Sequence, residues 1–376
     1  MSNIKLFISR LTAVSLLFFF LAALAAAKEI HFIHVSDLHY GLYRDFQGKK
    51  HVSAQEVNRT LIDRINALPQ ETIPGDGGVG AGEAVDYVNF IVNTGDIANR
   101  MEKGVQPAAA SWRQFITDWT HRLTLKDNAG RPTPIYLLPG NHDASNAIGF
   151  HRQLTPPTDA SSIAGIYNLM MHPAKPADKA TFDYAKDRIG YSVTGDGIHY
   201  VFAGIWPDSK TRAWIAADID TLAPGTPVII FAHDPPEVEA KHFINPNGKH
   251  DINARDKFEN LLADTASVKS TKQEPAAERR QLANFVKAHP SIKAYFHGHT
   301  NYSEFYWWKD GKGQDILPVF RVDSPMKGEL SATDESLLSF TFVTIDTDKR
   351  LLTAREYLWN SKQAHWGKSM TIKLDR

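Results

Sequence analysis

The chain has 376 residues, of which 43% are hydrophobic and 22% charged, so it can bury a large core, and disorder, collagen and a long coiled coil are excluded. It contains no cysteine, which excludes disulfides, thiolate nucleophiles and cysteine-ligated metal sites. The 42 basic residues balance the 42 acidic ones. We therefore expect neither a nucleic-acid groove nor a stable membrane partner.

Residues 1–27 have the pattern of a secretory signal peptide. Lys5 and Arg10 supply positive charge before an apolar run at 11–24, and Ala27 ends a small-residue cleavage pattern. The apolar run of about 14 residues is shorter than the roughly 20 that span a bilayer. We expect cleavage after Ala27 and a periplasmic or secreted protein. The alternative is an uncleaved membrane anchor.

Residues 28–376 are expected to form a single domain in which strands and helices alternate. Apolar, β-branched and aromatic runs predict strands at 30–35, 87–93, 134–138, 190–193, 200–205, 227–232 and 292–296. Helical patterns occur at about 53–68, 107–123, 210–222, 253–263 and 275–288. Ser53 and Glu56 have the spacing of a capping box at the first of these helices.

Long connections and the C-terminal part complete this organisation. We expect loops at 40–53, 75–83 and 150–186, and the last of these is a long surface excursion. The C-terminal part, about 302–376, is predicted to be all β and to complete the second of two sheets. Its expected strands lie at 305–308, 319–322, 337–345 and 351–357.

Five predicted strands end in loops with side chains that can bind a metal. These side chains are Asp37 and His39, Asp96, Asn141 and His142, His233, and His299. Because the carboxyl ends of neighbouring strands converge on one crevice in α/β proteins, we expect a single site.

Each of these loops has a local physical reason for its residues. Asp37 and His39 are two positions apart, which places both side chains on one side of an extended segment. Gly95 and Gly140 each precede a polar residue, and a residue without Cβ permits a sharp turn and lets the backbone approach an ion or a phosphate closely. Asp96 has two oxygens with which it can bridge two cations.

The ordered motifs resemble those of the calcineurin-like metallophosphoesterases. They are Asp37-Leu38-His39, Gly95-Asp96, Gly140-Asn141-His142-Asp143, Ala232-His233 and Gly298-His299. This resemblance implies an α/β fold, a four-layer sandwich of two mixed β-sheets flanked by helices. It also implies a metal-dependent phosphoric ester hydrolase that acts on a small-molecule phosphoester.

The resemblance further implies two divalent metal ions, Mn, Fe or Zn, and a role for each motif residue. Their expected ligands are Asp37 and His39 for the first ion, Asp96 for both, and Asn141, His233 and His299 for the second. His142 is the expected non-ligand histidine beside the leaving group. The ions would lower the pKa of a bridging water, and the hydroxide formed would attack phosphorus in line.

Two positions depart from the family pattern. Asn301 stands where many members have a second histidine; we expect Asn301 or a water to fill that position, and the alternative is a different metal preference. Asn99 stands where the serine/threonine phosphatase branch of the family has an acid, which leaves Asp143 or no side chain to orient His142. Arg100 is a candidate for gripping the phosphate.

The sequence leaves several alternatives open. The main alternative hypothesis is a protein on the same scaffold that binds a single metal and a phosphate ligand without catalysis. A protein phosphatase is a third hypothesis. A weak likeness of residues 233–236 and 298–305 to the acid sphingomyelinase branch points to phosphodiesters. Monoester or diester preference, metal identity and oligomeric state stay undetermined. His31 and His34 are expected to be structural, and His172 and His242 receive no role.

Overall fold

The computed structural model describes residues 29–99, 105–144, 159–243, 262–264, 270, 273–362 and 365–375. The expected signal peptide and Arg100 lie outside these ranges, as does nearly all of the predicted helix at 253–263. None of the helices within the described ranges has the length and apolar character needed to cross a membrane.

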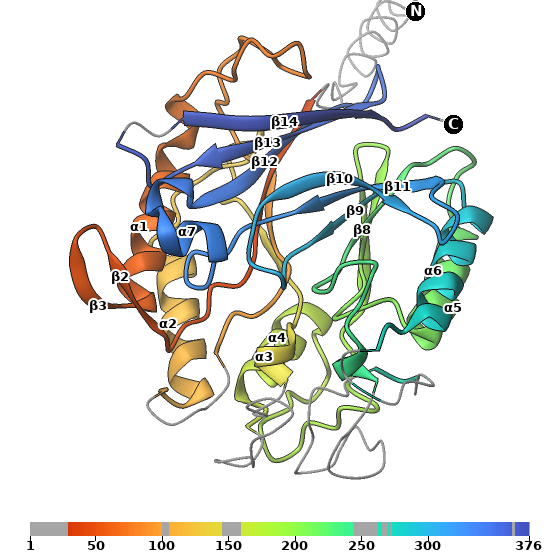
Figure 1. Ribbon diagram of the computed structural model, residues 1–376, viewed down its shortest axis with the longest axis horizontal. Helices are drawn as coiled ribbons and strands as arrows, with labels where there is room; N and C mark the ends of the chain where they lie inside the picture. The colour runs from red at the N-terminus through yellow and green to blue at the C-terminus, as the bar shows by residue number, and fades with distance from the viewer. Residues whose placement is uncertain are drawn as a thin grey trace, which may run out of the picture.

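Two six-stranded sheets form the centre of the fold (Figure 1). The strands of the first sheet, in spatial order, are β14 (His365–Lys373), β13 (Leu351–Leu358), β12 (Ser339–Asp346), β1 (Glu29–Val35), β4 (Phe90–Asn93) and β5 (Ile135–Leu137). Those of the second are β10 (Glu304–Lys309), β11 (Asp315–Arg321), β9 (Ile292–His297), β8 (Val228–Phe231), β7 (Ile198–Phe202) and β6 (Tyr191–Gly195). Both sheets are mixed, since β1, β4 and β5 run parallel, as do β7, β8 and β9, whereas β12 and β6 are antiparallel to their neighbours.

Helices cover the outer faces of both sheets. The longer helices are α1 (Ala54–Ala67), α2 (Ala108–His121), α4 (Ser161–Met171), α5 (Ser209–Ile219) and α6 (Ala276–Ala288). Leu61 of α1 and Phe115 of α2 belong to the core on the first sheet, and Ile215 of α5 belongs to the core on the second. This arrangement confirms the predicted four-layer sandwich.

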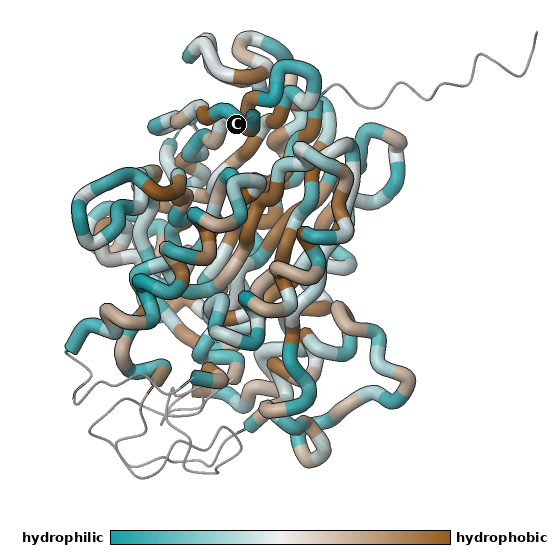
Figure 2. The backbone as a smooth tube through the Cα atoms, turned by 90° about the vertical axis from the view of Figure 1, so that its right-hand side faces the viewer, coloured by the Kyte–Doolittle hydropathy of each residue, from teal (hydrophilic) through white to brown (hydrophobic). Residues whose placement is uncertain are grey.

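Aromatic side chains fill the space between the sheets. The ring of Phe32 on β1 lies 4.8 Å from that of Phe90, 5.8 Å from that of Phe231 and 5.6 Å from that of Phe296. The hydrophobic segments accordingly gather in the central strands, while hydrophilic ones lie on the outer helices and loops (Figure 2). Each such ring pair contributes about 0.5–1.5 kcal/mol of stability beyond that of its buried area. This packing stabilises the position of one sheet relative to the other.

The start of α1 follows the sequence prediction in part. The Ser53 hydroxyl accepts a hydrogen bond from the Glu56 N–H at 3.3 Å, as an N-cap residue does. The Glu56 carboxylate, however, meets the ammonium of Lys49 at 3.3 Å. This contact is a surface ion pair in place of the return bond of a capping box.

The C-terminal part differs from its prediction in two respects. β10 and β11 extend the second sheet, but β12, β13 and β14 extend the first, so this part completes both sheets. It also contains a short helix, α7 (Glu329–Thr333), and a turn of 3₁₀ helix, η3 (Glu335–Leu337), so it is not all β.

Two expected loops contain regular structure. Residues 40–53 include the hairpin of β2 (Tyr43–Phe46) and β3 (Lys49–Ser53). Residues 150–186 include α4, which buries Ile163 and Ile166 against the first core. The remaining short elements are α3 (Asn141–Ala144), η1 (Leu68–Gln70) and η2 (Ala240–His242).

Candidate metal centre

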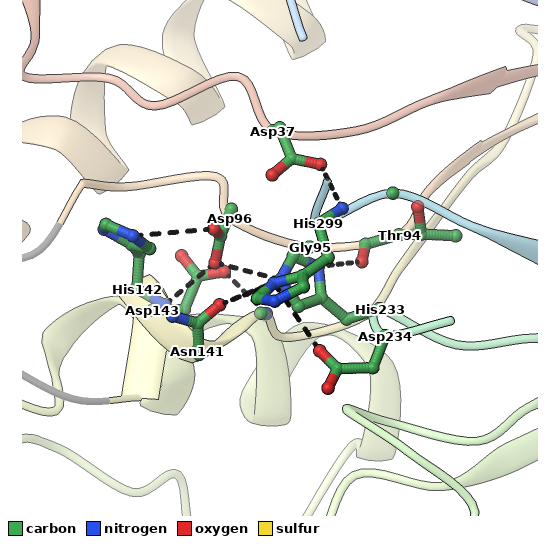
Figure 3. A network of polar contacts seen from close by, with 12 residues as sticks. Asp37, Thr94, Gly95, Asp96, Asn141, His142, Asp143, His233, Asp234 and His299 are labelled. Carbon is green, nitrogen blue, oxygen red and sulfur yellow. Dashed lines mark hydrogen bonds and ion pairs between the residues drawn. The ribbon is translucent and has the colours of Figure 1, made fainter. Parts of the chain in front are cut away.

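The predicted site residues of five loops meet at the carboxyl ends of β1, β4, β5, β8 and β9 (Figure 3). Backbone hydrogen bonds join these loops directly. The Asp37 N–H donates to the Gly95 carbonyl at 2.9 Å, and the Gly298 N–H donates to the His233 carbonyl at 3.1 Å. The parallel strands thus deliver side chains from distant parts of the sequence to one place.

Asp96 lies between two groups of candidate ligands. In the first group, His39 Nε2 is 3.6 Å from Asp37 Oδ1 and 3.6 Å from Asp96 Oδ2. In the second, His233 Nε2 is 3.5 Å from Asp96 Oδ1. The two carboxylate oxygens of Asp96 therefore face different groups.

The second group is compact. Asn141 Oδ1 lies 3.0 Å from His233 Nε2 and 3.1 Å from His299 Nδ1, and these two imidazole nitrogens are 3.1 Å apart. The backbone N–H of His299 also donates to Asp37 Oδ2 at 2.8 Å, which links the second group to the first. Nitrogen and oxygen donors thus converge from separate strands.

The backbone at these positions adopts the left-handed region that non-glycine residues seldom enter. The φ angles are 56° at Asp37, 43° at His39, 52° at Asp96, 68° at His299 and 58° at Asn301. Such conformations cost about 1–3 kcal/mol each and persist where the surroundings impose them. The rest of the fold therefore offsets this conformational cost and holds these side chains in their orientations.

Two motif glycines make room for the acids. A Cβ at Gly140 would collide with the carboxylate and backbone nitrogen of Asp96, and a Cβ at Gly298 would collide with Ser36 and Asp37. Gly95 has φ of +111°, which fits the predicted sharp turn. The sequence predicted that the backbone at Gly140 approaches an ion or a phosphate; in the structure it is Asp96 that this backbone approaches closely.

The donor set fits divalent cations. Asp37 Oδ1 and both ring nitrogens of His39 are buried and find no hydrogen-bond partner among the described residues. Buried polar atoms are nearly always partnered, and a cation beside Asp37 and His39 would supply the missing partner. Imidazole, carboxylate and amide donors suit Zn, Fe or Mn.

Electrostatics favour the ligand forms of two residues. Burial would raise the pKa of Asp37, but the neighbouring imidazoles of His39 and His233 hold that pKa below its ordinary value. Burial, followed by the positive charge of Lys327, lowers the pKa of His39. Asp37 is therefore anionic and His39 neutral near pH 7, as metal binding requires.

His142 stands beside the Asp96 carboxylate. Its backbone N–H donates to Asp96 Oδ1 at 2.8 Å, and its ring Nε2 lies 3.9 Å from Asp96 Oδ2. The centre of its ring is 4.8 Å from that of His39. The same Nε2 is 3.1 Å from the Lys327 ammonium. The ring thus has the metal-ligand groups on one side and a lysine on another.

Asp143 organises the backbone beneath the site. Its carboxylate accepts hydrogen bonds from the N–H groups of Ile97, Ala98 and Gly140 and from the Ser162 hydroxyl, at 2.6–3.1 Å. Burial and the charge of Asp96 raise its pKa to about 6. Asp143 therefore ties the Asp96 loop to the loop that carries Asn141 and His142, a role distinct from the expected orientation of the His142 ring.

The positions that depart from the family pattern also lie at the site. Asn301 lines the same cavity as Asn141 and His299, and its Nδ2 donates to the His299 carbonyl at 3.0 Å. Its buried Oδ1 has no hydrogen-bond partner among the described residues, so this uncharged oxygen is available as a ligand for a cation. Asn99 is buried, and its N–H donates to the Tyr40 carbonyl at 2.9 Å.

A second layer of acidic and basic side chains surrounds His299, and the sequence prediction missed it. Glu239 Oε2 lies 3.5 Å from His299 Nε2, and Asp234 Oδ1 lies 3.5 Å from His299 Nδ1. His242, to which no role was assigned, has its Nδ1 2.6 Å from Asp234 Oδ2. Carboxylates beside a ligand histidine fix its orientation and raise its basicity. The only sequence signal was that Asp234 follows His233 directly.

The turn after β11 is hydrogen-bonded to the loop that carries Asp37. The Ser324 hydroxyl donates to the Asp37 carbonyl at 2.8 Å, and Arg44 Nη1 donates to the Pro325 carbonyl at 2.6 Å. Next to Ser324, burial raises the pKa of Asp323 to about 8. Folding therefore favours the neutral form of this carboxyl group.

Replacing Asp323 by Asn should stabilise the protein at pH 8 by about 2 kcal/mol or more. The folded-state pKa is raised, so the native chain holds a proton that the unfolded chain releases near pH 4. The stability of the wild type then falls as the pH rises from 4 to 8, whereas the amide of the variant does not titrate. Urea unfolding of both proteins at pH 4.5 and pH 8 measures this. An equal difference in unfolding free energy at the two pH values would contradict it.

Comparison with known proteins identifies the family. Residues 30–303, well over half of the chain, match the sequence pattern of the calcineurin-like phosphoesterases. No curated protein matches the chain. This match confirms the resemblance seen in the motifs.

Among solved structures, the chain is similar to a purple acid phosphatase from yellow lupin (Lupinus luteus) seeds, with 11% identity and a TM-score of 0.48 over 92% of this chain and 54% of that one. The chain thus spans about half the length of the lupin protein. A dimetal phosphatase from Danio rerio shows 10% identity and a TM-score of 0.45 over 92% of this chain and 99% of that one. The family assignment rests on the sequence match: the chain belongs to the calcineurin-like phosphoesterases.

Proposed function

We propose that this protein is an exported dinuclear phosphoesterase that hydrolyses phosphomonoesters or phosphodiesters of small molecules. The observation that carries the proposal is the position of Asp96, whose Oδ2 lies 3.6 Å from His39 Nε2 and whose Oδ1 lies 3.5 Å from His233 Nε2. A carboxylate that faces two donor groups suits a pair of cations that share one ligand.

The proposed ligands divide as the two groups do. Asp37 and His39 would hold one ion with Asp96, whereas Asn141, His233 and His299 would hold the other with Asp96. Asn301 Oδ1 would be a further ligand of the first ion. When bound, the two ions supply a water of lowered pKa and stabilise negative charge on the phosphoryl oxygens.

The proposed acid is His142. Its ring lines the cavity beside Asp96, where it can donate a proton to the departing alkoxide or bind a phosphoryl oxygen. Arg100 lies outside the described residues, so its grip on the phosphate stays a prediction.

Export is proposed from the sequence of residues 1–27. β1 begins at Glu29, so cleavage after Ala27 would leave every strand and helix of the described fold in the mature chain. The absence of cysteine suits an exported protein that is stable without disulfides. The protein recovered outside the cytoplasm should begin at Lys28; full-length protein retained in the membrane would contradict this.

Metal removal tests the proposed activity. We expect the purified protein to hydrolyse nitrophenyl phosphate or bis(nitrophenyl) phosphate, and to lose at least about 99% of that rate after chelation because the nucleophilic water depends on the ions. Readdition of Mn, Fe or Zn should restore the rate. Hydrolysis that survives complete chelation would contradict the proposal.

A further inference from the structure

The two ring nitrogens of His299 face different carboxylates. Its Nδ1 lies 3.1 Å from Asn141 Oδ1 and 3.1 Å from His233 Nε2, so this nitrogen points to the second group of candidate ligands (Figure 3). The same Nδ1 is 3.5 Å from Asp234 Oδ1. The other nitrogen, Nε2, is 3.5 Å from Glu239 Oε2. A neutral imidazole carries its ring proton on only one of these two nitrogens.

The position of that proton decides whether His299 can bind a cation at the second group. With the proton on Nδ1, the ring donates to Asp234, Nδ1 has no lone pair to offer, and the lone pair of Nε2 faces the negative charge of Glu239. With the proton on Nε2, the ring donates to Glu239 and the lone pair of Nδ1 is free for a cation. Glu239 therefore favours the metal-binding tautomer, and Asp234 opposes it.

Both carboxylates also interact with a second side chain. Asp234 Oδ2 lies 2.6 Å from His242 Nδ1, and these two residues are fully buried. Glu239 Oε2 lies 2.5 Å from the Lys241 ammonium. Neither acid is therefore devoted to His299 alone, and the loss of Glu239 would leave Asp234 as the remaining acceptor beside the ring.

The segment that carries Glu239 is anchored to the core on the second sheet. Val238 and Phe243, on either side of this segment, are buried in that core. Val238 has φ of 22°, a conformation that a β-branched residue adopts only where its surroundings impose it. Arg279 of α6 donates from Nε to the Glu237 carbonyl and from Nη2 to the Val238 carbonyl. The fold thus fixes the backbone from which the Glu239 side chain reaches His299.

We propose that Glu239 is a positioning residue, which accepts a hydrogen bond from His299 Nε2 and thereby keeps the lone pair of Nδ1 available to the second of the two proposed ions. The inference rests on the dinuclear site of the proposed function. It assigns to the segment after β8 a role in the affinity of one ion and not of the other, whose proposed ligands are Asp37 and His39.

Glu239→Ala tests this role through metal binding, independently of turnover. The full chain, stripped of metal, is titrated with Zn²⁺ by calorimetry. We expect one of the two dissociation constants to rise about tenfold to a hundredfold and the other to change less than about threefold. The constant that rises should be the one lost in His233→Ala and not the one lost in His39→Ala. Glu239→Gln keeps an oxygen that can accept the hydrogen bond and should lose less affinity than Glu239→Ala.

Nitrogen-15 NMR of the histidine rings reports the tautomer directly. His299 is assigned by comparison with His299→Gln, and Zn²⁺ suits the measurement because it is a closed-shell ion. In the wild type we expect the ring proton of His299 on Nε2, with and without Zn²⁺. In metal-free Glu239→Ala we expect the proton on Nδ1, where it faces Asp234. A merely structural role of Glu239 would not move the proton from one nitrogen to the other.

Two further variants serve as controls. Glu237→Ala removes an acid of the same segment that accepts a hydrogen bond from the Tyr306 hydroxyl at 3.0 Å, and it should change neither dissociation constant. Lys241→Met removes the ammonium beside Glu239 and should weaken Zn²⁺ binding much less than Glu239→Ala does. An equal loss in Glu239→Ala and either control would overturn the proposal, as would a His299 proton that stays on Nε2 in Glu239→Ala.

The metal and NMR measurements separate failure of this inference from failure of the proposed function. If the wild type binds two equivalents of Zn²⁺ but hydrolyses no phosphoester, and Glu239→Ala still weakens one site, the proposed function is wrong and the role of Glu239 stands. If the wild type hydrolyses phosphoesters and Glu239→Ala binds both ions as the wild type does, the role of Glu239 is wrong. Thermal unfolding of each variant shows whether the fold is retained.

Discussion

Replacing Asp96 by Asn is expected to lower kcat for nitrophenyl phosphate by about a thousandfold, equivalent to about 4 kcal/mol of transition-state stabilisation. Asp96 is the carboxylate that faces both His39 and His233, so its charge serves both proposed ions. An amide has one neutral oxygen and cannot bridge two cations as a carboxylate does. Steady-state kinetics of the metal-loaded variant measures the loss.

The Asp96→Asn variant should keep its fold. The amide oxygen can still accept the hydrogen bond that the His142 N–H donates to Asp96 Oδ1 at 2.8 Å. Asp63→Asn is a matched control, because Asp63 lies at the surface in an ion pair with Arg122 and should not affect turnover. Undiminished hydrolysis by Asp96→Asn would show that Asp96 has been assigned wrongly.

Replacing Gly140 by Ala should lower both stability and metal content. The added Cβ would collide with the carboxylate and backbone nitrogen of Asp96, so the Asp96 loop must move. Overpacking of this kind costs about 3 kcal/mol. We expect that loss in urea unfolding, together with a fall in bound metal at equal protein concentration.

Gly75→Ala is the matched control for this prediction. A Cβ at Gly75 meets no described atom within 4 Å, and its φ lies outside the left-handed region. Its unfolding free energy should therefore change by no more than about 0.5 kcal/mol. If Gly140→Ala binds metal and unfolds as Gly75→Ala does, the close approach of the two loops is not needed for the site.

The buried strands and the candidate ligands that follow them were predictable because their signals are local. β1, β4 and β8 are buried almost throughout. β4 and β8 appear in the sequence as short apolar runs that end at polar residues, and β1 is apolar except for Glu29, His31 and His34. Parallel strands must then bring their carboxyl ends to one edge. Short sequence motifs and this single rule were enough to bring Asp37, Asp96 and His299 together.

The missed elements carry weak local patterns. In β14 most side chains are exposed, as expected at the edge of a sheet, so no apolar alternation marks it. β2 and β3 are similarly exposed, and their turn depends on positive φ at Gln47 and Gly48. The division of the C-terminal strands between two sheets is a matter of long-range pairing, which no local pattern specifies.

The second layer of the site was unpredictable for the same reason. Lys327, Glu239 and His242 are defined by contacts with His142 and His299 across long stretches of sequence, and none belongs to a motif. Only the folded chain shows that these residues share the cavity or its wall.

Metal analysis of the purified mature protein, combined with kinetics on the same sample, tests the central claim most directly. We expect about two equivalents of Mn, Fe or Zn per chain and saturable hydrolysis of a phosphoester. Mutation of either Asp37 or His233 should remove part of that metal. One equivalent of metal with tight phosphate binding and no turnover would contradict the account.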